Sequence, residues 1–170
     1  VFDLDSTSLL GIARGLREEH RFESGRKITF APRVLLGAAE NPNVSPVEHR
    51  AVRLAKKIAA GAQFVQTQYC YDIPLLRRFM TAVADAGLLE QVFILIGVGP
   101  PRTAKAGEWM RTHVPGVHIP DSVIERMRGA RDQTREGLNL CVDLIQEVRT
   151  IPGVSGVHVM AYRQEETVAE

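Results

Sequence analysis

The sequence predicts an α/β fold built around a parallel β-sheet. Helical and extended patterns alternate along the whole chain, which is typical of strands joined by crossover helices. The extended run at residues 92–101, VFILIGVGPP, is almost entirely apolar, as expected for a strand covered on both faces of a parallel sheet. Two architectures remain open at this point, a doubly wound open sheet and a closed eight-stranded barrel. In both, ligands bind at the carboxyl ends of the strands.

The first part of the chain predicts a helix, a strand and a second helix. Residues 4–19 carry apolar side chains at helical spacing, with Ser6 or Thr7 as the N-cap. The apolar run 34–39 predicts a strand, since it breaks into the turn-rich segment ENPNVSP. Residues 46–60 predict a helix that starts at a proline, which the first turn tolerates, and stops before a glycine.

The middle of the chain predicts two strands with a helix between them. FVQTQ, residues 64–68, predicts a strand, and the helix expected over 73–87 ends at a glycine. The apolar strand 92–101 follows. The segments that end these strands, TQYCYD and GVGPPRT, are rich in Gln, Tyr and Gly. They therefore place hydrogen-bonding groups where a ligand would meet the edge of the sheet.

The last third of the chain predicts three helical pieces and a final strand. Residues 103–117 predict one helix and a short connection. Residues 120–150 predict a long helical region in two pieces, broken near Gly129 or Gly137. GVSGVHVMAY, residues 153–162, predicts the fourth strand.

Composition and charge exclude several classes of protein. With 45% hydrophobic and 24% charged residues among 170, the chain has the composition of one compact soluble domain. Its 21 basic residues are scattered among 20 acidic ones, so nucleic acid is not expected as a partner. No apolar segment reaches the roughly 18 residues of a membrane span. We therefore expect a cytoplasmic protein without membrane contact.

The cysteines and histidines indicate neither a redox motif nor a metal centre. Cys70 and Cys141 lie far apart and belong to no CxxC motif, which favours two buried thiols in a reducing compartment. The five histidines show no metal-binding spacing, so no metal is expected. His158 lies inside the fourth predicted strand, where a structural role is the ordinary expectation.

Two basic residues and a glycine-containing turn each allow two interpretations. Lys56 and Lys57 are adjacent on the predicted helix 46–60, where paired lysines usually form a solvated face. They could also bind the phosphates of a cofactor. GVGPPR, residues 97–102, lacks the spacing and lysine of a phosphate loop, and its prolines remove N–H donors. A tight turn between strand and helix is therefore favoured, although its backbone could line a flat ligand.

Gln66 and Gln68 are the most informative polar pair in the sequence. Side chains alternate along a strand, so both amides are expected on the same face of the strand 64–68. Two buried amides without partners would be costly. They either bind the backbone of neighbouring loops or donate to and accept from a heterocyclic ligand, and the residues alone leave both interpretations open.

Several motifs together resemble one enzyme family. The chain contains NP before a helix, then KK-I-x-AGA-x-F-x-x-TQ-x-x-YD, a GVGP turn and finally GVxGVHVMAY. In this order and spacing they resemble the methylenetetrahydrofolate reductase family. AGAxFxxTQ is the most specific of them, since it joins a helix stop, a strand and a ligand-facing glutamine.

The resemblance implies a (β/α)8 TIM barrel of which this chain holds about the last four βα units. Residues 1–170 would then form part of a single catalytic barrel domain whose N-terminal strands are absent. The catalytic acidic residues of the family lie on those earlier strands. None is therefore expected in this chain, which we expect to be inactive by itself.

The resemblance also implies a reaction in one-carbon metabolism that leads towards methionine biosynthesis. FAD would be the cofactor and NADH or NADPH the electron donor for reducing 5,10-methylenetetrahydrofolate to 5-methyltetrahydrofolate. A folate substrate and a homo-oligomer are expected, with an electron-transfer partner subunit as a further option. The alternatives are a related reductase with another pterin or donor and a non-catalytic barrel subunit.

Individual site residues follow from the same resemblance. Gln68 would contact the folate pterin and the reduced nicotinamide in turn, whereas Lys57 would bind the flavin diphosphate. The implied substrate-binding residues are Gln68, Gly97, Pro100, Tyr162, Arg163 and Gln164. The implied cofactor-binding residues are Ala38, Ala39, Asn41, Ser45, Arg53, Lys56, Lys57 and Gln66.

Overall fold

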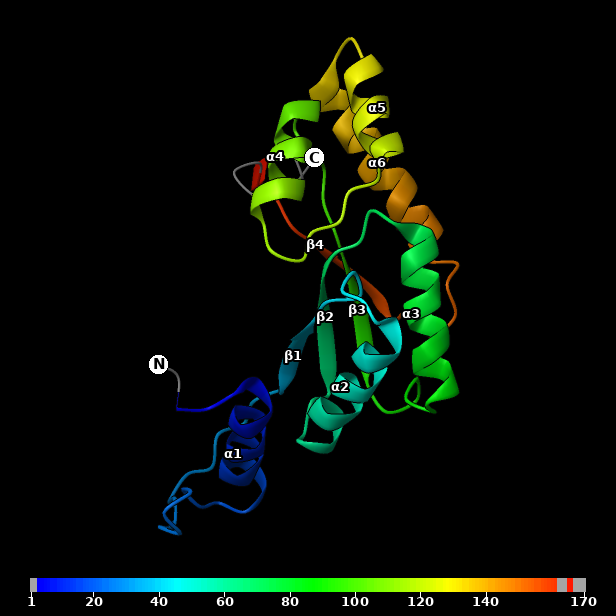
Figure 1. The fold of residues 1–170 in the computed structure, drawn as a ribbon. Coiled ribbons are helices and arrows are strands. Elements are labelled where there is room, and N and C mark those ends of the chain that lie inside the picture. The colour runs from blue at the N-terminus through cyan, green and yellow to red at the C-terminus, as the bar shows by residue number, and fades with distance from the viewer. Residues whose placement is uncertain (1–2, 162–164, 167–170) are drawn as a thin grey trace.

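The computed structural model describes residues 3–161 and 165–166, in which helices and strands alternate (Figure 1). The elements in chain order are α1 (Ser6–Glu18), β1 (Gly37–Glu40), α2 (Val47–Ala59), β2 (Phe64–Tyr69), α3 (Ile73–Asp85), β3 (Phe93–Val98), α4 (Ala104–His113), α5 (Asp121–Gly129), α6 (Gln133–Val148) and β4 (Gly156–Val159). The predicted alternation of helices and strands is confirmed.

The strands form one sheet in the order β1-β2-β3-β4, and every neighbouring pair is parallel. Strand order follows chain order, without the reversal that marks the switch point of a doubly wound sheet. The predicted parallel α/β fold is thus confirmed in coarse form, and this sheet is compatible with one part of a barrel. Closure into eight strands stays a prediction.

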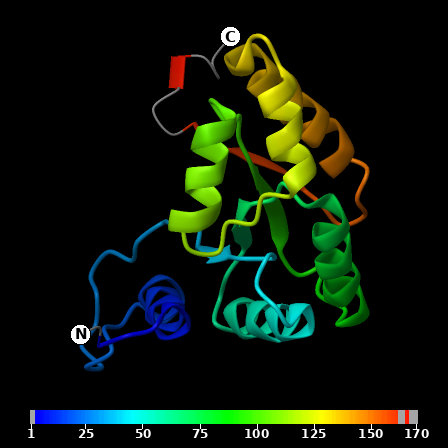
Figure 2. The same cartoon turned by 45° about the horizontal axis from the view of Figure 1, so that its top comes forward.

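The carboxyl end of the sheet carries the loops that lead from the strands into the helices. Figure 2 shows α2, α3 and α6 following one another around one side of the sheet. In Figure 1, α4 and α5 lie beyond the carboxyl ends of the strands, and α1 lies beside the β1 edge. Loops and extra helices therefore gather at the carboxyl end, where function resides in parallel α/β folds.

Side chains alternate between the two faces of the sheet, and one of these faces packs against the helices. Val65 in β2 and Ile94 and Ile96 in β3 are almost fully buried, and they pack with Leu54 of α2 and Phe79 of α3 in the main core. The intervening residues of β3 include Phe93, which is 67% exposed. The packed face holds the sheet and helices together, so the other face is available for ligand-binding side chains.

Two predicted element starts are wrong. β1 begins at Gly37 rather than at residue 34, because Leu36 instead packs with Leu10 of α1 and Ala62 in a small second core. The N-cap of α1 is Asp5, whose carboxylate accepts the Ser8 N–H at 2.7 Å, rather than Ser6 or Thr7. Aspartate is as good a cap as serine, so residue type alone did not decide between them.

The predicted break in the region 120–150 falls next to Gly129 and not at Gly137. Asp132 caps α6 by accepting the Arg135 N–H at 3.0 Å, so a new helix begins at Gln133 after the three residues that follow α5. Gly137 lies buried within α6 because the carbonyl oxygen of Pro101 occupies the space that a Cβ would need. It therefore serves close packing and not a break.

Among the residues that the structure describes, no helix combines the length and the apolar character needed to cross a bilayer.

Candidate functional site

A cleft of about 510 Å³ opens at the carboxyl ends of β1, β2 and β4. Its volume falls within the range of small-molecule sites. Residues from α1, β1, α2, β2 and β4 converge there from distant parts of the sequence. The lining residues are Ser6, Ala39, Glu40, Asn41, Arg50, Arg53, Lys57, Gln66, Thr67, Gln68, His158 and Met160.

The end of β2 presents its two glutamines to this cleft through an irregularity in the sheet. The pairing of β2 with β3 shifts between Gln66 and Tyr69. At that point the Thr67 hydroxyl accepts the Gly97 N–H at 2.8 Å and donates to the Gln68 carbonyl at 2.9 Å. A side chain thus takes the place of a ladder hydrogen bond, and both Gln66 and Gln68 line the cleft as predicted from alternation.

The side-chain amide of Gln68 makes one hydrogen bond of ordinary length and one weak hydrogen bond. Its Oε1 accepts the Tyr69 N–H at 3.0 Å, which fixes the orientation of the side chain. Its Nε2 donates to the Pro115 carbonyl at 3.5 Å, at the limit of a hydrogen bond. The amide can therefore exchange this weak contact for a ligand without disturbing its anchor.

A buried ion pair joins β1 to α2 in the wall of the cleft. The Lys57 ammonium lies 2.7 Å from Oε2 of Glu40, and the two side chains are only 7% and 2% exposed. Lys57 also donates to the Ala39 carbonyl at 2.5 Å, and Glu40 Oε1 accepts the Asn41 N–H at 3.0 Å. Both charges are thus compensated within the protein, as buried charges normally are.

Two other buried nitrogens in the lining of the cleft lack a hydrogen-bond partner in the part of the chain that the structure describes, although the Arg50 guanidinium lies 4.0 Å from Glu40 Oε1. Among side-chain nitrogen and oxygen atoms of the described residues, only Arg50 Nε and His158 Nδ1 are buried without a hydrogen-bond partner. Arg50 comes from α2 and His158 from β4, yet both residues line the same cleft. Buried polar groups are nearly always hydrogen-bonded, so two unpartnered nitrogens in the lining of one cleft are unusual.

The tyrosines that follow Gln68 belong to the framework of the site. The Tyr71 hydroxyl donates to the Gly99 carbonyl at 2.9 Å, and the Tyr69 hydroxyl donates to the Met160 carbonyl at 3.2 Å. Their rings are stacked with centroids 5.7 Å apart. Burial raises the pKa of Tyr71 above its usual range, so this hydroxyl remains a hydrogen-bond donor.

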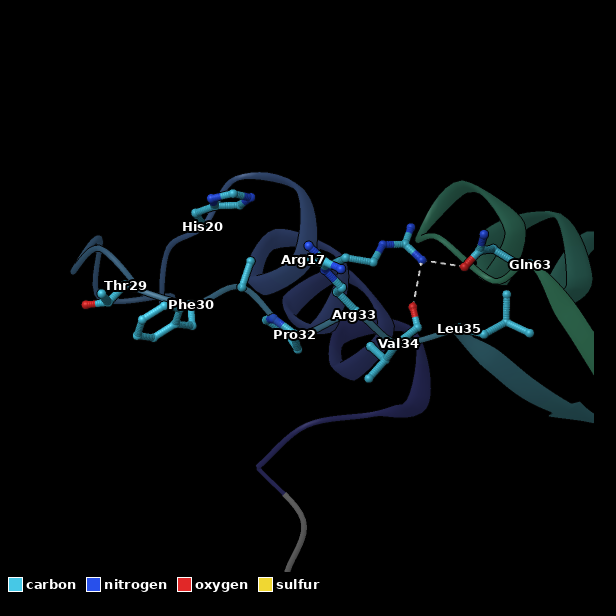
Figure 3. Close-up of a pocket in the computed structure, with 10 residues that line it drawn as sticks. Arg17, His20, Thr29, Phe30, Pro32, Arg33, Val34, Leu35 and Gln63 are labelled. Atoms are coloured by element: carbon cyan, nitrogen blue, oxygen red, sulfur yellow. Dashed lines mark hydrogen bonds between the residues drawn. The ribbon is translucent and has the colours of Figure 1, made fainter.

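A larger cavity of about 670 Å³ lies away from these residues, between α1 and the segment 29–35 (Figure 3). Arg17 reaches across it to the Val34 carbonyl at 3.3 Å and to the side-chain oxygen of Gln63. Gln63 precedes β2, so the contact lies at the amino ends of the strands, where residues usually serve stability. None of the predicted site residues lines this cavity.

The predicted site residues divide into three groups. Those that line the cleft are Ala39, Asn41, Arg53, Lys57, Gln66 and Gln68. Those that lie outside its lining are Ala38, Ser45, Lys56, Gly97 and Pro100. Tyr162, Arg163 and Gln164 lie outside the described residues. The roles assigned to all of them stay predictions.

Three lining residues with strong chemical character were not among the predicted contacts, namely Glu40, Arg50 and His158. A signal for His158 was present in its strand, because alternation places it on the same face as Gly156. Glu40 and Arg50 gave no comparable signal, since a charged residue after a strand or within a helix is usually solvated.

The thiols and possible metal ligands add no further chemistry. Burial raises the pKa of Cys70 to about 12 and also raises that of Cys141, so neither thiol is a ready nucleophile at neutral pH. The prediction that both cysteines are buried is confirmed. Within residues 3–161 and 165–166, no group of three or more His, Cys, Asp or Glu side chains is placed to hold a metal ion.

Comparison with solved structures shows a similar fold in an uncharacterized protein from Clostridium thermocellum, described as binding two copies of 5-methyl-5,6,7,8-tetrahydrofolic acid. The TM-score is 0.66 at 18% sequence identity, a likeness that shows the fold. The alignment covers 98% of this chain and 56% of that one, so this chain spans little more than half of the similar protein.

A comparison with curated proteins gives no significant match. The family model described as methylenetetrahydrofolate reductase, however, matches residues 27–170. This range includes the whole sheet and every cleft residue except Ser6. Because the match extends over most of the sequence, the chain belongs to the methylenetetrahydrofolate reductase family.

Proposed function

We propose that the protein reduces 5,10-methylenetetrahydrofolate to 5-methyltetrahydrofolate, with FAD as cofactor and NADH or NADPH as electron donor. Membership of the family supports a folate reductase, and a structurally similar protein binds a methylated tetrahydrofolate. The observation that carries the proposal is the cleft itself, in which two unpartnered buried nitrogens lie with Gln68 at the carboxyl ends of parallel strands.

The charges of the cleft fit a cofactor that carries a diphosphate. Arg50, Arg53 and Lys57 on α2 all line it, and the unpartnered Nε of Arg50 suits an anionic oxygen. These three residues would hold the diphosphate of FAD. When bound, the flavin would supply the hydride chemistry that amino-acid side chains lack.

The remaining polar residues would bind and orient the substrates. The Gln68 amide can both donate and accept, so it can serve a nicotinamide and a pterin in turn. Its anchor on the Tyr69 N–H keeps its orientation constant between the two. His158 Nδ1 offers a further hydrogen-bonding position on β4. The chain's own contribution is therefore to position the reactants.

The visible absorbance spectrum of the purified full-length protein tests this function. We expect a flavin band that bleaches when NADH or NADPH is added without oxygen and returns when methylenetetrahydrofolate follows. The bleaching reports the first half reaction and the return reports the second. A protein that binds no flavin even after FAD is added would contradict the proposal and favour a non-catalytic barrel subunit.

The choice of substrate is tested in the same experiment. If the band bleaches with a nicotinamide but returns only with another pterin, the protein is a related reductase. Turnover with each nicotinamide, measured at matched concentrations, then identifies the donor.

A further inference from the structure

Asn43, in the loop after β1, joins the end of β2 to the segment between α4 and α5. Its Nδ2 donates to the Tyr69 carbonyl at 2.8 Å and to the Gly116 carbonyl at 3.1 Å. Asparagine is common in turns, where its side chain usually bonds backbone two residues further on. Here the side chain instead reaches residues that are 26 and 73 positions away in the chain. Its contacts therefore do more than form a local turn.

The neighbouring asparagine holds the same carbonyl group. Asn41 Nδ2 donates to the Gly116 carbonyl at 3.0 Å, and Asn41 Oδ1 accepts the Asn43 N–H at 3.0 Å. Gly116 has a φ angle of 75°, and a Cβ at this position would overlap the Asn41 side-chain amide. A carbonyl oxygen has two lone pairs, so the two asparagines together fill its hydrogen-bonding capacity.

The segment 114–119 is also attached to the core and to α3. Val117 and Ile119 are 6% and 1% exposed and belong to the main core. His118 Nε2 lies 3.2 Å from Oδ2 of Asp72, the residue that caps α3. The asparagines and the core thus hold this segment from two sides, which fixes where it passes the carboxyl end of β2.

The two segments that Asn43 joins are the two that the Gln68 amide contacts. Gln68 Oε1 accepts the Tyr69 N–H at 3.0 Å, and Gln68 Nε2 donates to the Pro115 carbonyl at 3.5 Å. Asn43 binds the carbonyl of Tyr69 and the carbonyl of Gly116, which follows Pro115. Asn43 does not itself line the cleft, whereas Gln68 does. The backbone that orients the Gln68 amide is therefore held in place from outside the cleft.

We propose that Asn43 is a positioning residue that fixes the orientation of the Gln68 amide towards the substrate. The ligand of that amide, a reduced folate, rests on the proposed function. The hydrogen bonds that give Asn43 its positioning role do not, because they join parts of this chain to one another.

A double-mutant cycle in the full-length protein tests this role. The variants are Asn43→Ala, Asn43→Asp, Gln68→Ala and the double variant Asn43→Ala with Gln68→Ala. Asn139→Ala is the matched control, because it removes an exposed asparagine of α6 that donates to Glu136 at 3.4 Å. Isothermal titration calorimetry measures the dissociation constant of 5-methyltetrahydrofolate for each protein. The melting temperature reports whether each variant retains the fold.

Asn43→Ala should weaken 5-methyltetrahydrofolate binding by about three- to tenfold, up to the contribution of the Gln68 hydrogen bond itself. Asn43→Asp keeps the size of the side chain but turns an acceptor towards two carbonyl oxygens, so its loss should be at least as large. The control should bind as the wild type does. The fold should be retained, since Asn41 still holds the Gly116 carbonyl.

The double variant distinguishes positioning from a purely structural role. If Asn43 acts through Gln68, the double variant should bind 5-methyltetrahydrofolate within about twofold of Gln68→Ala alone. If Asn43 only stabilises the loops, its removal should weaken binding by the same factor whether or not Gln68 is present. Such additive losses would overturn the inference, and so would wild-type affinity in Asn43→Ala or in Asn43→Asp.

The flavin half reactions of the same variants separate this inference from the proposed function. Folate binding that depends on Asn43 through Gln68, in a protein whose spectrum shows no flavin reaction, would support the inference and contradict the reductase. Flavin turnover that depends on Gln68 and not on Asn43 would do the reverse. A wild-type protein that binds no 5-methyltetrahydrofolate would contradict both, since this folate is the product of the proposed reaction.

Discussion

Single side chains decide which hydrogen bonds the cleft can offer, and the two glutamines of β2 illustrate how. Alternation predicted that Gln66 and Gln68 share a face, and both line the cleft. The sequence left open whether their amides bind loop backbone or a ligand. Gln68 combines the two interpretations, because one end is anchored on the Tyr69 N–H and the other makes only a 3.5 Å contact with Pro115.

Under the proposed function, replacing Gln68 by alanine should slow both half reactions while FAD stays bound. The loss should be about tenfold in each rate constant, the value of roughly one hydrogen bond that orients the substrate. Anaerobic stopped-flow absorbance measures the two steps separately. Gln91→Ala, which removes an exposed glutamine bonded to the Gly87 carbonyl, is the matched control and should leave both rates unchanged. Wild-type rates in Gln68→Ala would refute the role.

Gly97 is a second position where one residue controls the site, here through the lack of a side chain. A Cβ at Gly97 would lie 2.6 Å from Met160 Cε and 2.7 Å from the Gln68 carbonyl oxygen. Gly97→Ala should therefore push β2 and β3 apart and lower the free energy of unfolding by about 1–3 kcal/mol. Urea denaturation measures this change.

The control for this substitution is Gly11→Ala in α1, where no atom lies within 4 Å of the added Cβ. Alanine favours helix there, so this variant should be more stable by up to about 1 kcal/mol. Equal stability of Gly97→Ala and wild type would show that the strands yield easily at this position.

Helices and strands form the next scale, and the loop between β2 and α3 shows how an element start supports the site. The Asp72 carboxylate accepts the Leu75 N–H at 2.9 Å and so caps α3. Its second oxygen lies 3.2 Å from His118 Nε2 in the loop after α4. One side chain thus joins the helix start to the segment that also contains Pro115, the partner of Gln68.

Asp72→Ala should destabilise the protein by about 1 kcal/mol through loss of the cap. Asp72→Asn should recover most of that loss, since asparagine caps equally well and only the charge facing His118 is removed. Thermal or urea unfolding of the two variants distinguishes the contributions. If Asn were as damaging as Ala, the contact with His118 would matter more than the cap.

Element prediction succeeded where local signals were strong and failed where packing decided the boundary. Gly61 and Gly87, expected as helix stops, both adopt positive φ angles. Residues 34–36 look like part of a strand but precede β1, and Leu36 is buried against Leu10 of α1 and Ala62. Apolar character indicates burial, and it does not reveal which partner buries the side chain.

At the scale of the whole molecule, the core determines how the two thiols behave. Cys70 is 1% exposed, and burial raises its pKa to about 12. Its thiol should therefore resist iodoacetamide at about pH 8, near the pKa of an ordinary thiol, until the protein unfolds. The rate of alkylation should rise with urea in parallel with unfolding. Rapid alkylation in native buffer would contradict the buried position.

The same pKa shift gives stability a pH dependence. Below the ordinary thiol pKa of 9.0, Cys70 is protonated in both folded and unfolded chains. Between pH 9.0 and about 12 only the unfolded chain loses the proton, so the free energy of unfolding should fall as the pH rises. Cys70→Ala should show a shallower decline over this window in urea titrations.

Local sequence patterns were enough to predict the alternation of helices and strands, the parallel sheet, the shared face of Gln66 and Gln68 and the resemblance to the reductase family. These features depend on local periodicity and short motifs, which need no knowledge of the partners of each element. The pairing of Glu40 with Lys57, and the placement of Arg50 and His158 in the lining of one cleft, became visible only in the folded protein. The physical reason is that charge pairing and burial depend on how α2 packs on β1 and where β4 joins the sheet. Both therefore depend on contacts between residues that are far apart in the chain.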